Sequence, residues 1–161
     1  KHHRDLAGGL AGEEIEDAMT QPELIVLARQ FATDENLDPS LVCAVVEQES
    51  AWDPQAIRYE PAFFHRYVAP LNLPSATESH ARAFSWGLMQ VMGQVAREHG
   101  FKGKYLSELC IPEIGLEIGC RVLAAKLKAG SASVAAGLLR WNGGGNSKYP
   151  DEVLARMDHY A

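Results

Sequence analysis

Apolar side chains recur at helical spacing along most of the chain. The clearest stretch is 112–129, where Ile114, Ile118 and Val122 fall on one face and Gly130 follows the last turn. Residues 57–84 are less regular, and no convincing run of alternating apolar and polar residues predicts a strand. Further helices are predicted for residues 23–35, 41–49, 91–99, 133–141 and 150–160, and short ones are conceivable at 60–67 and 78–84. The pattern predicts a mostly α fold with an irregular middle segment.

Start signals support two of these helices. Pro22 suits the first turn of the helix at 23–35. Asp38 is a good N-cap residue, and Pro39 follows it at the first helical position before the apolar run 41–46. Both helices are therefore predicted with defined beginnings.

The chain length of 161 residues predicts one domain. Residues 1–21 are Gly-rich and acidic, and we expect an N-terminal tail or a weakly anchored helix there. The folded domain is expected to span residues 22–161. With 47% hydrophobic and 22% charged residues, the chain has enough apolar material for a core.

Charge and hydropathy exclude several classes of protein. A net charge of −6 argues against a nucleic-acid binder. No apolar run is long enough to span a membrane, and no N-terminal export signal is visible. Cys43 is expected in the core; Cys110 and Cys120 could pair in an oxidising compartment, but free thiols are favoured. No Cys/His spacing indicates a metal site, and no cofactor is expected.

Glu49 is the leading candidate for chemistry. It lies at the end of the apolar helix 41–49, where apolar surroundings and the negative helix end both disfavour a charged carboxylate. Both effects raise the pKa of a carboxyl group, as a general acid requires. Taken alone, this position favours a solvated residue where the helix stops, and the rest of the chain reverses that preference.

Three segments place polar side chains beside glycines or an aromatic residue. Glycine lets a backbone approach a ligand closely. Aromatic rings and amide groups suit sugar rings, hydroxyls and N-acetyl groups. The segments are Glu49-Ser50 with Trp52-Asp53-Pro54, then Gly87-Leu88-Met89-Gln90, then Trp141-Asn142-Gly143-Gly144.

Together these segments resemble the soluble lytic transglycosylase family of peptidoglycan-cleaving enzymes, which have a lysozyme-like fold. That family carries a Glu-Ser motif followed by an aromatic residue and Asp/Asn-Pro, then Gly-Leu-Met-Gln, then Ala-Tyr-Asn-Ala/Gly-Gly. The motifs occur here in the same order, and the resemblance covers residues 22–160. The Trp-Asn-Gly-Gly-Gly-Asn form and the stretch 58–61 (Arg-Tyr-Glu-Pro) are most similar to phage or prophage members, of endolysin type.

The resemblance implies roles for individual residues. Glu49 would be the catalytic acid, with Ser50 beside it on the muramic-acid side of the substrate. Met89 and Gln90 would line the sugar cleft, and Asn142 would shape its floor. Trp141, Tyr59 and Glu60 are further candidates for substrate binding.

The chain departs from the family pattern at two neighbouring positions. Trp141 stands where the family usually has tyrosine, and Arg140 where it usually has alanine. The contact of the family tyrosine's hydroxyl to the reacting region therefore cannot be carried over. Trp141 could still stack on a sugar and shield Glu49 from water.

The resemblance implies cleavage of the MurNAc–β-1,4–GlcNAc bond of peptidoglycan without water, giving a 1,6-anhydro sugar. Most glycosidases need two carboxylates, whereas no recognisable motif pairs a second one with Glu49. Two alternatives stay open: a hydrolytic muramidase in which Glu60 or another acid positions water, and a glycan-binding virion domain without turnover. We expect a monomer that binds glycan strands, is made in a host cytoplasm, and reaches the wall after release or within a virion.

Overall fold

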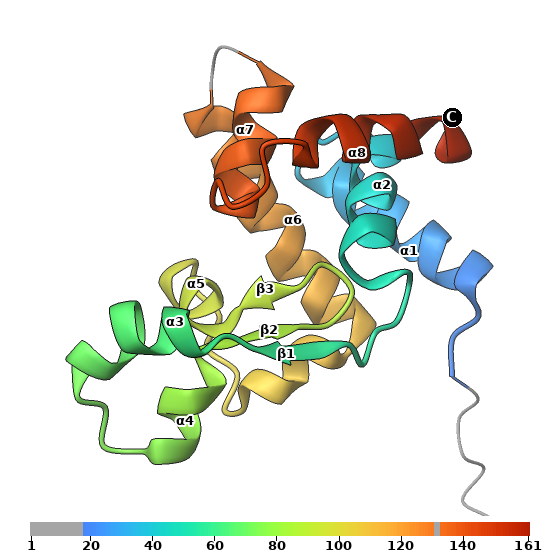
Figure 1. The fold of residues 1–161 in the computed structure, drawn as a ribbon. Coiled ribbons are helices and arrows are strands. Elements are labelled where there is room, and N and C mark those ends of the chain that lie inside the picture. Colours follow the sequence, from blue (N-terminus) through green and yellow to red (C-terminus); the bar gives the residue numbers. More distant parts are fainter. Residues whose placement is uncertain (1–17, 131–132) are drawn as a thin grey trace, which may run out of the picture.

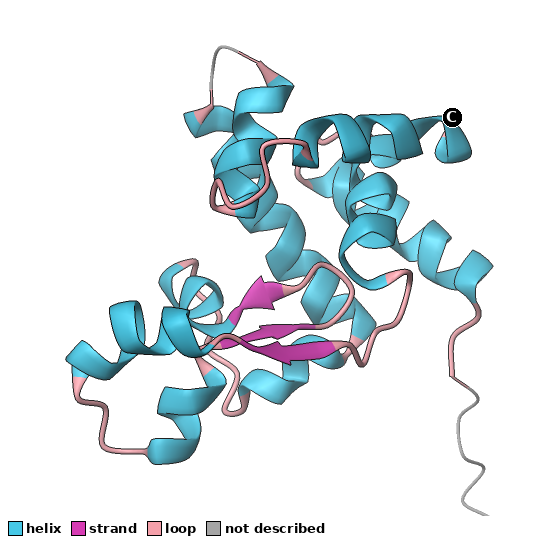
Figure 2. Cartoon of the chain, viewed as in Figure 1, coloured by secondary structure: helices cyan, strands magenta, loops and turns pink. Residues whose placement is uncertain are grey.

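The chain folds into a mostly helical structure with a small sheet (Figures 1 and 2). The computed structural model describes residues 18–130 and 133–161. The mostly α, lysozyme-like prediction is confirmed. The main elements are α1 (Gln21–Asp34), α2 (Pro39–Ser50), β1 (Ile57–Tyr59), α3 (Pro61–Phe63), α4 (Ala76–Ala81), β2 (Phe84–Trp86), β3 (Val91–Met92), α5 (Gly93–Glu98), α6 (Pro112–Ala129), α7 (Val134–Asn142) and α8 (Tyr149–Arg156).

The first two helices begin where their start signals lie. Thr20 caps α1 through a reciprocal pair of hydrogen bonds with Glu23. The Asp38 side chain accepts a hydrogen bond of 2.9 Å from the Ser40 backbone N–H at the start of α2. Residues 1–17 of the expected tail lie outside the described residues, and Met19 already packs against the core.

The apolar run of α2 forms the centre of the core. All six residues from Leu41 to Val46 are buried, because α1, α8 and the C-terminal 3-10 turn (Met157–Tyr160) pack around this helix. Helix α6 contributes Leu116 and Leu123 to the same core. A stretch of helix that is apolar on all sides must be enclosed in this way.

The three-stranded antiparallel sheet corrects the sequence prediction. β1 pairs with β2, with Ile57 opposite Trp86, and β2 pairs with β3, with Ser85 opposite Met92. Strands of two or three residues are too short to display an alternating pattern. The sequence instead suggested helices reaching to 84 and starting at 91.

The segment between β1 and β2 is helical but broken. α3 passes into a π-helical turn (Phe64–Val68) and a 3-10 turn (Ala69–Leu71). α4 then ends at Ala81, three residues before the helix end expected at 84. Another short 3-10 helix (Leu106–Cys110) precedes α6.

Two regions form the molecule and meet along α6 (Figure 1). We call residues 57–110, which hold the sheet and α3 to α5, the β region. The helical region comprises α1, α2, α7 and α8. Among the described residues, no helix is long and apolar enough to cross a membrane. The three cysteines are free, with Cys43 and Cys120 buried.

Candidate active site

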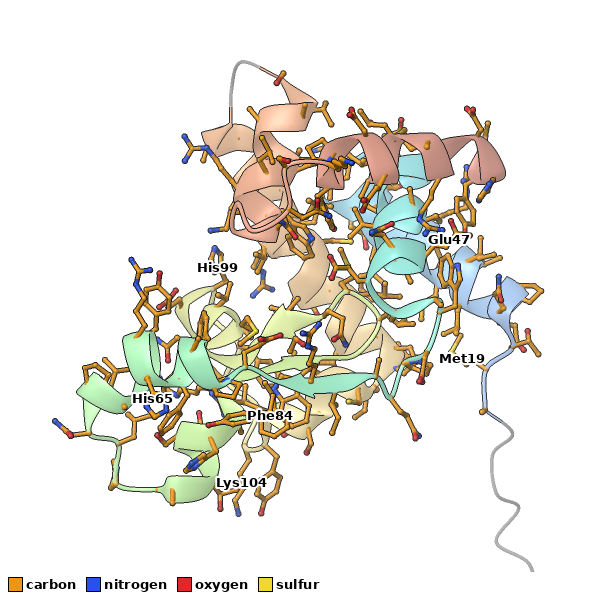
Figure 3. All side chains as sticks on the ribbon, viewed as in Figure 1. Met19, Glu47, His65, Phe84, His99 and Lys104 are labelled. Atoms are coloured by element: carbon orange, nitrogen blue, oxygen red, sulfur yellow. The ribbon has the colours of Figure 1, made fainter. Side chains whose placement is uncertain are left out.

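A cleft of about 960 Å³ separates the two regions. The helical region contributes residues of α2 and α7, the β region contributes residues from β1 to α5, and α6 adds two side chains. Glu49 lies within this cleft. Its lining includes Gln48, Glu49, Glu60, Gln90, Trp141 and Asn142 together with an apolar margin of Phe63, Tyr67 and Leu71. Figure 3 shows side chains from both regions projecting toward the space between them.

Glu49 occupies the last turn of α2, immediately before a tight turn of the backbone. Ala51 and Trp52 both adopt the left-handed conformation, with φ of 50° and 66°. This conformation is unfavourable for a bulky side chain, so the surrounding contacts must enforce it. The Trp52 indole N–H donates a hydrogen bond of 2.8 Å to the Tyr160 hydroxyl, and the Trp52 ring is buried.

The Glu49 carboxyl is held by two aromatic side chains. The Tyr149 hydroxyl donates to Glu49 Oε2 at 2.6 Å. The Trp141 indole N–H donates to the Tyr149 oxygen at 3.0 Å and lies 3.4 Å from the same Oε2. The three side chains form a closed triangle that fixes one carboxyl oxygen.

The other carboxyl oxygen of Glu49 is open to the cleft. Oε1 accepts no hydrogen bond from the described residues. Every buried polar side-chain atom of those residues has a hydrogen-bond partner, so Oε1 is not one of the buried atoms. Oε1 is therefore reached by solvent. A proton on the carboxyl group is best placed on Oε1, because Oε2 already accepts hydrogen from Tyr149.

Burial sets the protonation of this site. It raises the pKa of Glu49, and the hydrogen bonds from Tyr149 and Trp141 offset only part of that rise. No charged side chain is among the causes of the shift. The pKa of Tyr149 is also raised, by burial and then by the negative charge of Glu49. Tyr149 therefore remains a hydrogen-bond donor while Glu49 is the group that titrates.

A polar network ties α2 to α8 beside Glu49. The Gln48 amide donates to Glu152 at 2.9 Å and accepts from Arg156 at 2.7 Å. Asn146 also donates to Glu152, at 3.2 Å. These bonds fix the position of α8, and Tyr149 is the first residue of that helix.

The segment Gly87–Gln90 forms the turn between β2 and β3. The Gln90 amide donates to the carbonyls of Ala56 (2.8 Å) and Gly87 (2.9 Å), and its oxygen accepts from the Ser85 hydroxyl at 2.9 Å. Gln90 lines the cleft, but these bonds use both amide hydrogens. Its observed contacts hold the turn against the segment that leads from α2 to β1.

Three of the expected substrate-binding residues lie away from the cleft surface. Met89 is fully buried, and its sulfur packs so closely on Gly119 of α6 that a methyl group there would collide with it. The Ser50 hydroxyl donates to the Val46 carbonyl at 3.1 Å, within α2. Tyr59 packs on Phe84, with ring centroids 5.0 Å apart. None of the three lines the cleft.

Glu60 and Asn142 lie in the cleft wall on opposite sides. Glu60 follows β1 and forms an ion pair of 3.1 Å with Arg58. Asn142 ends α7, and Gly143 follows it with a φ of 80°. Among the described residues, no hydrogen bond connects Glu49 to a second carboxylate, and no cluster of side chains could hold a metal ion.

Tyr149 and Gln48 are functional candidates that the sequence did not reveal. One signal pointed toward Tyr149: the family tyrosine is absent at position 141, and a tyrosine starts the next helix. Nothing local in the sequence marks Gln48, whose partners lie 104 and 108 residues away.

Comparison with known proteins identifies the family of this chain. Searches among curated proteins and among solved structures gave no match. A family model described as the transglycosylase SLT domain matches residues 27–152. Because that match covers most of the chain and includes Glu49, Trp141 and Tyr149, the chain belongs to the transglycosylase SLT domain family.

Proposed function

We propose that this peptidoglycan transglycosylase cleaves the MurNAc–β-1,4–GlcNAc bond without water, with Glu49 as its single acid and then its base. One observation carries the proposal: the Glu49 carboxyl has a raised pKa, one oxygen held by Tyr149 and Trp141, and one oxygen open to the cleft. A proton donor needs this combination of a protonated state and access to the substrate.

In the first step, Glu49 donates its proton to the glycosidic oxygen. The bond between that oxygen and C1 of MurNAc breaks, and the GlcNAc hydroxyl leaves with the proton. The carbonyl oxygen of the MurNAc N-acetyl group bonds to C1 and takes up the positive charge. Glu49 is left as a carboxylate, and the Tyr149 and Trp141 donors stabilise the new negative charge on Oε2.

In the second step, the C6 hydroxyl of the same MurNAc attacks C1 and displaces the N-acetyl oxygen. Its proton passes to Glu49, which returns to the protonated state. The product has a 1,6-anhydro end, and no water is consumed. The substrate thus supplies the nucleophile that a second protein carboxylate provides in ordinary retaining glycosidases.

The surroundings of Glu49 favour this chemistry over hydrolysis. A second catalytic carboxylate beside Glu49 would add a negative charge to the causes of its pKa shift, and no charge is among them. Glu60, the alternative partner, is engaged with Arg58. A binding domain without turnover has no use for a buried acid, because burying a carboxyl group costs stability.

Product analysis tests the proposal. Purified sacculi are digested in water labelled with heavy oxygen, and the released muropeptides are analysed by mass spectrometry. We expect anhydro ends, each one water lighter than a reducing end, with no label. Labelled reducing ends would instead establish a hydrolytic muramidase, and binding to sacculi without release of fragments would establish a binding domain.

A further inference from the structure

Two positively charged side chains line the cleft on the side formed by α6 and α7, which we call the helical wall. Lys126 comes from α6 and Arg140 from α7. The two helices pack closely, because Gly137 has no side chain and Leu127 fills the space that a methyl group would need. Lys126 precedes Leu127, and Arg140 follows Gly137 by about one helical turn. Both charges therefore belong to one part of the wall.

Arg140 differs from the other arginines of residues 18–130 and 133–161. Five of those form ion pairs, Arg29 donates to the Tyr160 carbonyl, and Arg66 lies over the Tyr67 ring. Arg140 has no such partner within the described ranges, and Lys126 has no ion pair there either. Arg140 also stands where the motif of the family usually has alanine.

Arg140 lies near the candidate catalytic acid. Arg140 is adjacent to Trp141, whose indole N–H lies 3.4 Å from Glu49 Oε2. On the opposite wall, Arg58 forms an ion pair with Glu60, and exposed Glu98 accepts a hydrogen bond from Gln94. The acidic and basic residues that line the cleft are Glu49, Arg58, Glu60, Glu98, Lys126 and Arg140. The helical wall is thus positive in a chain of net charge −6.

Arginine and lysine side chains in a binding cleft select carboxylates, and guanidinium can bind one through two parallel hydrogen bonds. The sugar rings of peptidoglycan carry hydroxyl and N-acetyl groups but no free carboxylate. The carboxylates lie on the peptide stem attached to the MurNAc lactyl group. We infer that Arg140, assisted by Lys126, binds a stem-peptide carboxylate of the MurNAc residue at the cleaved bond, and so favours peptide-bearing strands over bare glycan. This inference rests on the proposed function.

Three matched substrates test this preference. The first is a set of soluble peptide-bearing glycan strands, and the second is the same material after an amidase has removed the peptides and the lactyl carboxylates exposed in this way have been converted to amides. A third sample carries peptides whose carboxylates have been converted to amides. For each substrate the ratio kcat/KM is measured, and the chemical nature of the product end is recorded separately.

The wild-type protein should prefer peptide-bearing strands, and amidation of the carboxylates should remove the preference. Arg140→Ala should reduce the preference about three- to tenfold, mainly through KM, as expected for a partly exposed charge-assisted hydrogen bond. Arg140→Lys should keep part of it, and Lys126→Ala should reduce it less. Lys128→Ala is the matched control, since Lys128 lies on the same helix outside the cleft lining and should not change the preference.

Binding of the same fragments to the Glu49→Gln protein, measured by calorimetry, gives a readout without turnover. Weaker binding of peptide-bearing fragments after adding Arg140→Ala supports the inference. Equal losses on peptide-bearing and bare strands, or a wild-type protein without preference, would overturn it. Reducing product ends would reject the proposed chemistry and leave the peptide preference as a separate result.

Discussion

The Tyr149 hydroxyl donates a hydrogen bond of 2.6 Å to Glu49 Oε2, across 100 residues of sequence. This contact supplies a tyrosine hydroxyl at the candidate acid, although the family's tyrosine is replaced by Trp141. The Trp141 indole N–H in turn donates to the Tyr149 oxygen at 3.0 Å. The tryptophan at position 141 therefore helps to hold Tyr149 in place. The position of the acid therefore depends on α2, α7 and α8 together.

Replacing the acid should abolish activity without unfolding the protein. Glu49→Gln keeps the shape and can still accept a hydrogen bond from Tyr149, but it cannot donate an acidic proton. We expect activity on sacculi to fall about 10²–10⁴-fold, the usual loss for a general acid. Near-native lysis by a folded Glu49→Gln protein would reject Glu49 as the acid.

The same variant should change how stability depends on pH. Folded Glu49 binds its proton more tightly than the unfolded chain does, since burial raises its pKa above the ordinary 4.5. The wild-type protein therefore loses stability as pH rises from 4.5 through the folded-state pKa. Glu49→Gln lacks this loss. The free energy of unfolding of the variant minus that of the wild-type protein should therefore increase over that pH window and then level off. Denaturant melts at several pH values measure this, and a pH-independent difference would contradict the raised pKa.

Removing the Tyr149 hydroxyl should raise the pKa of Glu49 further. Tyr149→Phe takes away a donor that stabilises the charged carboxylate, so the decline of kcat/KM at high pH should move to higher pH. Stability should fall by about 1–3 kcal/mol from the lost hydrogen bond. Tyr160→Phe is the matched control, because its hydroxyl also accepts from an indole N–H but does not contact Glu49. Identical pH profiles for the two variants would show that Tyr149 acts only in packing.

Two replacements of Trp141 should move the pH profile in opposite directions. Trp141→Phe keeps a ring over Glu49 but loses the N–H, and so should raise the pKa of Glu49. Trp141→Ala admits water, and because burial is the largest cause of the shift, the pKa should fall. The alanine variant should also lose stability, but less than the roughly 3–5 kcal/mol of a fully buried aromatic residue, because Trp141 is only partly buried. If melting temperature drops while both pH profiles stay at the wild-type position, Trp141 is a core residue alone.

Glu60→Gln should leave the reaction largely intact. Glu60 pairs with Arg58 in an exposed ion pair, which contributes about 0–1 kcal/mol. We expect only a mild reduction in activity and the same anhydro products. Complete loss of activity in a folded variant would instead identify Glu60 as a second catalytic carboxylate.

Gln90→Ala should act first on stability. It removes the partners of two carbonyls and of the Ser85 hydroxyl, at an expected cost of about 1–3 kcal/mol. Gln94→Ala provides the comparison, because that cleft-lining amide bonds only the side chains of Arg82 and Glu98. Gln90→Ala should therefore melt at a lower temperature than Gln94→Ala. A rise in KM without a drop in melting temperature would favour direct sugar binding by Gln90.

Local patterns in the sequence were sufficient for the long helices and for the position of Glu49. Helical periodicity, Asp38 as a cap and the apolar run of α2 all act within a few residues, so they could be interpreted without the fold. The same local information placed Glu49 at the end of a buried helix. Its raised pKa was predicted for a reason that the structure retains, which is burial.

Only the tertiary structure decided which side chains surround Glu49. Tyr149 and Gln48 act through partners about a hundred residues away, and such pairs depend on how α2 packs against α8. The sheet was missed for a related reason, since its strands are too short for a pattern and exist through pairing with distant residues. Met89 matches a family motif yet lies in the core, because Gly119 of α6 lets it pack there. A sequence determines what each segment prefers locally, whereas packing decides which side chains meet.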